Sequence, residues 1–183
     1  TVLWHAAAGG VGLIAMQWLK SIGATVIGTA GGPEKCALAK EAGATHVIDY
    51  KAEKFVDRVK EITGGKGCDV VYDSIGKDTF PLSLDCLKPL GLFVTFGNAS
   101  GPISGMDPGI LAAKGSLYMT RPTLMTYVAK RDDLVATAND LFDVVKKGAV
   151  KINVKHEYPL AAAEQAHADL EGRKTTGSIV LVP

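Results

Sequence analysis

The sequence contains few cysteines. Only three occur among its 183 residues, Cys36, Cys68 and Cys86, and no two of them form a C-x-x-C pair. An odd and scattered set of this kind indicates neither a disulfide framework nor a zinc cluster. We expect the three thiols to be buried or half-buried and chemically inert.

The sequence also lacks an excess of charge of either sign. Its 20 basic and 19 acidic residues give a formal net charge of +1, and no basic stripe with interleaved aromatic residues is present. No apolar run approaches the roughly 18 residues that a membrane-spanning helix needs. These absences argue against a nucleic-acid or membrane partner, and we predict a soluble, cytoplasmic protein.

The first twelve residues carry the most informative pattern. An apolar segment, residues 1–4, leads into the turn A-x-G-x-x-G and then into a long apolar stretch. Ala7 begins the turn, Gly9 leaves room for phosphate groups to approach the backbone, and Gly12 lets a helix pack closely on its strand. The first turn of that helix would bind the diphosphate of a dinucleotide; the alternative is a glycine-rich turn without a ligand. The residues expected to contact the cofactor here are Gly9, Gly10, Val11 and Gly12.

Strands and helices alternate along the first two thirds of the chain. This order is typical of an α/β fold with a doubly wound parallel sheet, the Rossmann fold, and 47% hydrophobic residues suffice for its core. We predict that residues 1–121 form a dinucleotide-binding domain. Beyond Pro122 the rhythm changes to a long amphipathic helix, 132–147, and then strand, helix and strand, so residues 122–183 look like part of another domain. The six strands expected in the first domain are 1–4, 25–29, 46–50, 68–73, 92–96 and 116–120.

The end of the second strand indicates which nicotinamide cofactor fits. An NAD site usually places an acidic residue there, but this sequence reads Thr-Ala-Gly-Gly at 29–32. A 2′-phosphate can occupy that position if cations and donors are near, and Lys35 and Tyr50 are near in this topology. Each also has a plainer interpretation, Lys35 as a solvated charge and Tyr50 as a half-buried ring at a strand end. Together they favour NADPH over NADH.

The nicotinamide end should lie over the carboxyl ends of the fourth and fifth strands, where open α/β sheets bind ligands. Arg121, at the end of the sixth strand, would lie beside it or would instead fix the turn at Pro122. No catalytic acid or base can be named, because the four histidines lack partners at ligand spacing and are better explained as structural residues. The residues expected around the nicotinamide are Ser74, Ile75, Phe96, Gly97, Asn98 and Arg121.

Four separated segments give the chain a family resemblance. They are the Ala-Ala-Gly-Gly-Val-Gly turn and residues 70–76, 114–122 and 170–177. Together these segments resemble the NADPH-dependent quinone oxidoreductases, the zeta-crystallin-like branch of the medium-chain dehydrogenase/reductase superfamily. The resemblance implies an enzyme that passes reducing equivalents from NADPH to a quinone without zinc or another metal. It also implies that Gly31, Lys35, Tyr50 and Arg173 surround the 2′-phosphate.

The resemblance has a second implication, for the part of the protein that binds the substrate. Members of this family begin with a separate GroES-like substrate domain, so Thr1 is expected to begin a fragment, and residues 122–183 to return into that domain. Such a fragment should bind cofactor better than it turns over substrate. Two alternatives stay open: an enoyl thioester reductase of the same superfamily, and a noncatalytic, crystallin-like NADPH-binding protein.

The sixth strand suggests an oligomer. Residues 117–119 are apolar, and the outer edge of this last strand would be unpaired. Edges of this kind are usually covered or used. We therefore predict a homodimer that pairs residues 116–120 with the same strand of a second copy, as is also usual in the superfamily.

Overall fold

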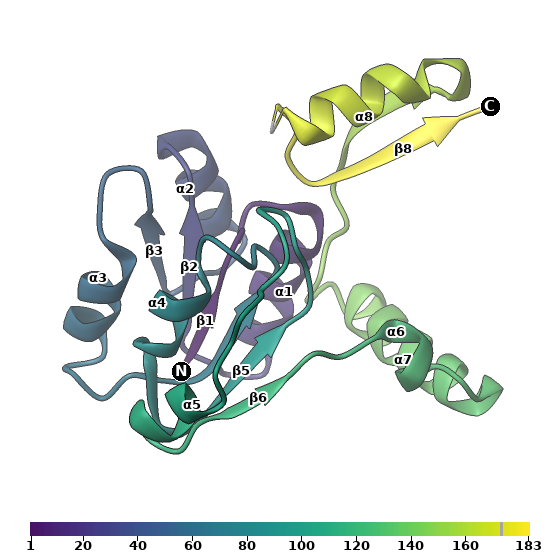
Figure 1. Cartoon of the computed structure of the whole chain (residues 1–183). Helices are drawn as coiled ribbons and strands as arrows, with labels where there is room; N and C mark the ends of the chain where they lie inside the picture. The colour runs from purple at the N-terminus through teal and green to yellow at the C-terminus, as the bar shows by residue number, and fades with distance from the viewer. Residues whose placement is uncertain (173) are drawn as a thin grey trace.

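A computed structural model of the chain describes residues 1–172 and 174–183. Its centre is a six-stranded sheet in the order β3-β2-β1-β4-β5-β6, and every pair in it is parallel (Figure 1). This arrangement confirms the predicted doubly wound α/β fold. The strands are β1 (Val2–Trp4), β2 (Val26–Ala30), β3 (His46–Asp49), β4 (Cys68–Asp73), β5 (Leu87–Thr95) and β6 (Tyr118–Thr120).

The middle of the sheet is apolar on both faces. On one face, Leu3 of β1 lies in register with Ile27 of β2 and Val71 of β4, and all three side chains are fully buried. On the other face, Val2 and its register partner Val26 are buried. Parallel strands covered on both faces have no exposed side that would favour polar residues. This explains why these segments read as continuous apolar runs in the sequence.

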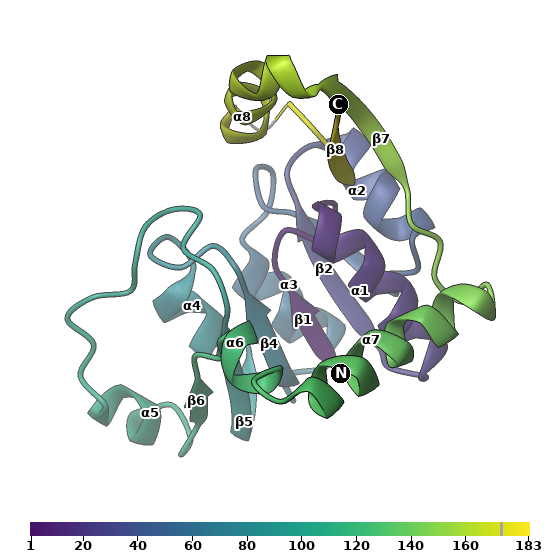
Figure 2. The same cartoon turned by 90° about the vertical axis from the view of Figure 1, so that its right-hand side faces the viewer.

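Helices cover both faces of the sheet (Figures 1 and 2). On one face, Met16 of α1 and Ala39 of α2 pack with Val26 of the sheet. On the other, Val59 of α3 and Leu84 of α4 join the larger cluster around Leu3, against which residues of α5 also pack. The helices are α1 (Gly10–Ser21), α2 (Pro33–Glu41), α3 (Phe55–Ile62), α4 (Phe80–Leu84) and α5 (Gly109–Ala113).

The C-terminal part forms a second, smaller sheet in which β7 and β8 pair in parallel. Figure 1 shows α8 and β8 together above the carboxyl ends of the main strands. The C-terminal part contacts the main body at two places. Gly9 forms an isolated β-bridge with Gly177, and the side chain of Gln17 forms two hydrogen bonds with the backbone of Lys151. The division at residue 121 stays a prediction. The elements are α6 (Leu124–Tyr127), α7 (Arg131–Lys146), β7 (Val154–Pro159), a 3₁₀ turn (Leu160–Ala162), α8 (Ala163–Glu171) and β8 (Ser178–Val182).

Several element boundaries differ from those expected. The fifth strand begins at Leu87 instead of residue 92, because Leu87 pairs with Cys68 before a register shift lets Leu92 pair with Val70. The short helices α5 and α6 were not predicted. Both have five residues or fewer, too few for a periodic pattern to stand out.

The cysteines are placed as expected. Cys68 and Cys86 are buried, Cys36 is half-buried, and all three are free thiols. Burial raises the pKa of Cys68 to about 11 and raises that of Cys86 further, so neither forms a thiolate near neutral pH. Among the described residues, no helix has both the length and the apolar character needed to cross a bilayer.

The packing of α1 on β1 depends on Gly12. A Cβ atom added there would lie 2.4 Å from the carbonyl oxygen of Ala6 and 2.6 Å from that of Ala7. Both atoms belong to backbone, so neither can move aside without distorting the turn. The sequence expectation for Gly12, a helix packed closely on its strand, is therefore what the structure shows.

We predict that Gly12→Ala lowers the free energy of unfolding by about 1–3 kcal/mol or more, because the new methyl group meets backbone atoms that cannot move aside locally. Urea denaturation followed by circular dichroism measures this change. The matched control is Gly109→Ala at the start of α5, where an added Cβ meets only the exposed Asp107 carboxylate at 3.3 Å. The control should change stability by no more than about 1 kcal/mol; equal effects of the two variants would contradict this account of the packing.

Candidate cofactor site

The turn between β1 and α1 is held by its own backbone. Ala6 adopts a left-handed conformation with φ 55°, the N–H of Gly9 donates to Ala6 O over 3.0 Å, and the N–H of Ala7 donates to Thr29 O over 2.9 Å. Among residues 1–172 and 174–183, no side chain caps the N-terminus of α1, and the first turn of this helix contains no acidic residue. The positive end of the helix dipole is thus available to an anion.

The predicted contacts of this turn lie together. Gly9 is the N-cap residue of α1, and Gly10, Val11 and Gly12 form its first turn. Val11 is 63% exposed, so the first turn is open to solvent at that point. Gly10 faces the C-terminal segment, since a Cβ there would lie 3.1 Å from Gly177 O. Small residues are therefore required on both sides of the turn.

Two of the residues predicted for the 2′-phosphate, Gly31 and Tyr50, lie together at the end of β2. The hydroxyl of Tyr50 lies only 2.6 Å from the position that a Cβ of Gly31 would take, so a larger residue at 31 would have to displace the Tyr50 ring. Lys51 reaches the same place, with its Cε 3.2 Å from that position. Lys51 was missed from the sequence, although it directly follows Tyr50. The structure thus brings a hydroxyl and an ammonium group to Gly31.

A carboxylate also approaches this corner, from the third strand instead of the second. Oδ1 of Asp49 accepts hydrogen bonds of 3.0 Å from the N–H groups of Gly32 and Lys51. These bonds lower the pKa of Asp49, the one from Gly32 contributing most. Asp49 therefore fixes the backbone on both sides of the corner, with its charge partly compensated by two peptide dipoles.

The other two residues expected at the 2′-phosphate are Lys35 and Arg173. Lys35 is the third residue of α2, whose N-cap, Gly32, directly follows Gly31. It thus belongs to the helical turn that opens at this corner. Arg173 lies outside the described residues.

The surface predicted for the nicotinamide is formed by two loops in close backbone contact. A Cβ at Gly97 would lie 2.5 Å from Ser74 O, and one at Gly76 would lie 2.5 Å from Gly101 O. The N–H of Ser100 donates to Ile75 O over 2.8 Å, which links the loops again. Residues 74–76 and 97–101 therefore form one surface at the carboxyl ends of β4 and β5.

Two further predicted residues flank this surface. Nη1 of Arg121 lies 3.5 Å from the carbonyl oxygen of Gly97, at the limit of a hydrogen bond, so Arg121 is beside the loop. The ring of Phe96 packs against Trp4 and Tyr72, at centroid distances of 5.4 and 6.5 Å. Because its ring is occupied in that cluster, Phe96 has mainly backbone to offer at the loop, whereas Asn98 is exposed.

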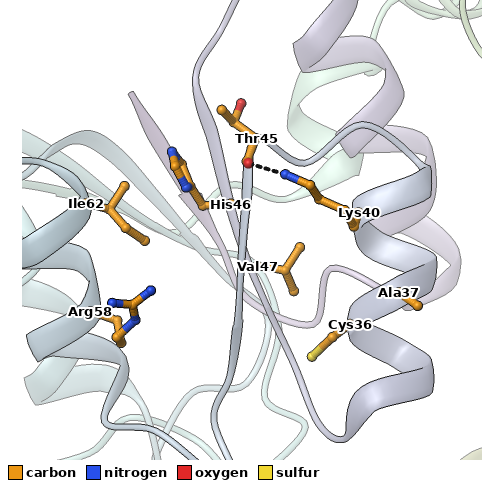
Figure 3. A pocket seen from close by; sticks show the side chains of 8 residues that line it. All are labelled: Cys36, Ala37, Lys40, Thr45, His46, Val47, Arg58 and Ile62. Carbon is orange, nitrogen blue, oxygen red and sulfur yellow. Dashed lines mark hydrogen bonds between the residues drawn. The ribbon is translucent and has the colours of Figure 1, made fainter.

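A separate hollow lies away from these residues. Figure 3 shows it between α2, the amino-terminal part of β3 and α3, where Lys40 donates a hydrogen bond to the backbone oxygen of Thr45. None of the predicted cofactor residues lines it. Its second cation, Arg58, is already paired with Glu53 and Glu61. The candidate cofactor site is therefore the strand-end surface and not this hollow.

These observations describe a single edge of the sheet. A glycine turn at β1, a glycine corner at β2 and paired loops at β4 and β5 all lie at strand carboxyl ends, around the reversal point between β1 and β4. Comparison with protein families agrees with this geometry, since a model of the family described as zinc-binding dehydrogenase matches residues 10–143. The chain belongs to this family. Among the described residues, no group of three or more His, Cys, Asp or Glu side chains is arranged to hold a metal ion.

Within the family, the predicted resemblance to quinone oxidoreductases is confirmed. The chain is 53% identical to a quinone oxidoreductase of Pseudomonas aeruginosa over 183 residues, which is all of this chain and 56% of that protein. It is also 48% identical to a 2-haloacrylate reductase of Burkholderia over 185 residues, covering 100% of this chain and 55% of the relative. The chain thus spans little more than half the length of these relatives.

A solved structure gives the same result for the fold. The Escherichia coli quinone oxidoreductase complexed with NADPH is 52% identical and superposes with a TM-score of 0.97, covering all of this chain and 56% of the other. The family's strand order and flanking helices are therefore those of the present chain.

His5 gives the site a testable electrostatic property. It lies directly after β1, is 2% exposed, and has its pKa lowered, chiefly because burial disfavours the charged ring. At about pH 6.5 and below, the unfolded chain therefore takes up a proton at this histidine more readily than the folded chain does. The contribution of neutral His5 to the free energy of unfolding is therefore fully present above that pH and is lost as the pH falls.

We predict that the melting temperature decreases between about pH 7.5 and 5.5, with up to about 1.4 kcal/mol lost per pH unit at the acidic end. The carboxylates with lowered pKa values, such as Asp49, contribute only at lower pH. Replacing the exposed His46 by Gln is the control and should leave the slope unchanged. A flat or rising melting temperature over this range would show that His5 is not held neutral.

Proposed function

We propose that the strand-end surface binds NADPH in an extended conformation. The diphosphate would lie at the first turn of α1, the adenosine 2′-phosphate at the corner of Gly31, Tyr50 and Lys51, and the nicotinamide at the loops after β4 and β5. The observation that carries the proposal is the set of glycines whose missing Cβ atoms leave backbone exposed or closely packed at all three places. The similarity to the NADPH complex of the E. coli enzyme supports it.

The preference for the phosphorylated cofactor rests on charge. Lys51 and the hydroxyl of Tyr50 lie beside Gly31, and Lys35 is on the helix that starts at the same corner. Asp49 is the acid of this corner, and one of its oxygens already accepts two backbone N–H groups. A 2′-phosphate would therefore meet more donors than acceptors. Residues 29–32, at the end of β2 itself, include no acid of the kind that accepts from a free ribose 2′-hydroxyl in NAD sites.

We predict that Lys51→Gln weakens NADPH binding about fivefold to tenfold and leaves NADH binding within twofold, because one charge-assisted contact to the phosphate is lost. Fluorescence titration of each reduced cofactor measures both affinities. Lys54→Gln, an exposed lysine just before α3, is the matched control and should change neither. Equal loss for both cofactors would argue against a 2′-phosphate contact.

For the whole protein, we propose reduction of a quinone by NADPH. Bound NADPH would supply the hydride, and the residues of this chain would hold the cofactor in the orientation that the transfer needs. The loops at 74–76 and 97–101 would support the ring end. Three similar proteins named quinone oxidoreductase, at 52–54% identity, support this activity.

A second candidate activity is reduction of an activated carbon–carbon double bond. The similarity to a 2-haloacrylate reductase favours it, and it uses the same cofactor half. Steady-state assays of the full-length protein with NADPH separate the two. Turnover of ortho- or para-quinones supports the first candidate, and turnover of 2-haloacrylates or enoyl thioesters alone supports the second. NADPH binding without turnover of either class would indicate the noncatalytic alternative.

We further propose a cytoplasmic homodimer formed through β6. Tyr118 of this edge strand is 62% exposed, and the outer side of the strand has no neighbour within the described sheet. An apolar, unpaired edge favours pairing with a second copy. The low number of cysteines agrees with a reducing compartment.

Sedimentation velocity tests the dimer. We predict a particle of about twice the 19.2 kDa chain mass at micromolar concentration. Tyr118→Lys should convert it to a monomer, because a lysine on an edge strand opposes strand pairing. A monomeric unmodified protein would contradict the proposal.

A further inference from the structure

A row of buried polar side chains runs beneath the candidate site and is not used in the function proposed above. It comprises Thr29 on β2, His5 after β1, Ser83 on α4 and Asp73 at the end of β4. All four are at most 2% exposed. Buried polar groups are costly unless their hydrogen bonds are satisfied, so a connected set of this kind restricts the local structure to one arrangement.

The contacts in this row are continuous. Nδ1 of His5 lies 3.0 Å from Oγ1 of Thr29, and Nε2 lies 3.0 Å from Oγ of Ser83. The Ser83 hydroxyl in turn donates to Oδ2 of Asp73 over 3.2 Å. The ring of Phe55 meets the imidazole edge-on at 5.1 Å and excludes other polar partners on that side.

The direction of each bond follows from the chemistry of the groups. An ionised Asp73 can only accept, so the single hydroxyl proton of Ser83 is directed to Asp73. Ser83 must then accept from His5, which places the proton of the neutral ring on Nε2. Nδ1 is left as an acceptor for the hydroxyl of Thr29. The lowered pKa of His5, caused chiefly by burial, agrees with this neutral form.

Asp73 connects this row of hydrogen bonds to the turn that follows β4. Its Oδ1 accepts from the N–H groups of Ile75 and Gly76, over 2.7 and 3.0 Å, and its Oδ2 also accepts from Oγ1 of Thr79 over 2.7 Å. One buried carboxylate thus holds both N–H groups of the turn. The same turn packs against residues 97–101 at the proposed nicotinamide end.

We infer that His5, Ser83, Asp73 and Thr79 are positioning residues that hold the 74–76 turn in the shape that receives the nicotinamide half of the cofactor. The inference rests on the proposed NADPH site. The row begins beside the diphosphate turn, where Thr29 O accepts from the N–H of Ala7, and ends at Asp73, which bonds the 74–76 turn. Ser83 and Thr79 act at this second end. Loosening the row should therefore weaken NADPH binding through the nicotinamide half, while the adenosine half is unaffected.

Calorimetric titration with NADPH and with 2′,5′-ADP, which lacks the nicotinamide half, tests the inference. Ser83→Ala and Thr79→Val each remove one hydroxyl that Asp73 accepts from. We expect each to weaken NADPH binding about fivefold to tenfold and to leave 2′,5′-ADP binding within twofold. Thr79→Ser keeps the hydroxyl and should restore NADPH binding.

The controls separate positioning from general stability. Thr63→Val removes a half-buried hydroxyl that bridges Val59 O and the N–H of Gly67, far from the site. It should lower the melting temperature without changing the ratio of the two affinities. If Ser83→Ala does not fold, the Thr79 pair carries the test alone.

The possible results are distinct. Equal weakening of both ligands, or no change for either, in folded variants of a protein that binds NADPH would overturn the positioning role and leave the proposed function standing. Failure of the unmodified protein to bind either ligand would overturn the proposed function and the inference with it.

Discussion

The structure depends on how closely α1 approaches the turn after β1. Gly12 lies so close to the carbonyl oxygens of Ala6 and Ala7 that no Cβ atom fits between them. This contact directs the uncapped N-terminus of α1 toward the carboxyl ends of the central strands. The proposed binding of an anion at this turn would therefore follow from packing and would need no charged side chain.

Around this turn, each end of the site is fixed by one buried or partly buried carboxylate. Asp49 ties the backbone of Gly32 and Lys51 at the adenosine end, and Asp73 ties residues 74–76 at the other. Both carboxylates accept hydrogen bonds from peptide N–H groups and so hold the backbone at the two ends of the candidate site. The charge of Asp73, and of one oxygen of Asp49, is thereby partly compensated by peptide dipoles.

The sequence was sufficient for the features that depend on local pattern. The glycine turn, the buried strands and the strand order followed from short motifs and alternation, and the glycine at 31 followed from the family resemblance. Lys51 was missed because its role depends on its position relative to Gly31, twenty residues earlier. The row from Thr29 to Asp73 was missed for the same reason, since His5 and Ser83 are 78 positions apart and only the fold brings them together. Arg173 lies outside the described residues, and its role stays a prediction.

The central claim is that the first turn of α1 receives the diphosphate of NADPH. A crystal structure of the protein grown with NADPH tests it most directly. The account predicts diphosphate oxygens within hydrogen-bond distance of the N–H groups of Gly10, Val11 or Gly12, with the 2′-phosphate beside Tyr50. A nucleotide bound elsewhere on the protein, with no phosphate at this turn, would contradict it.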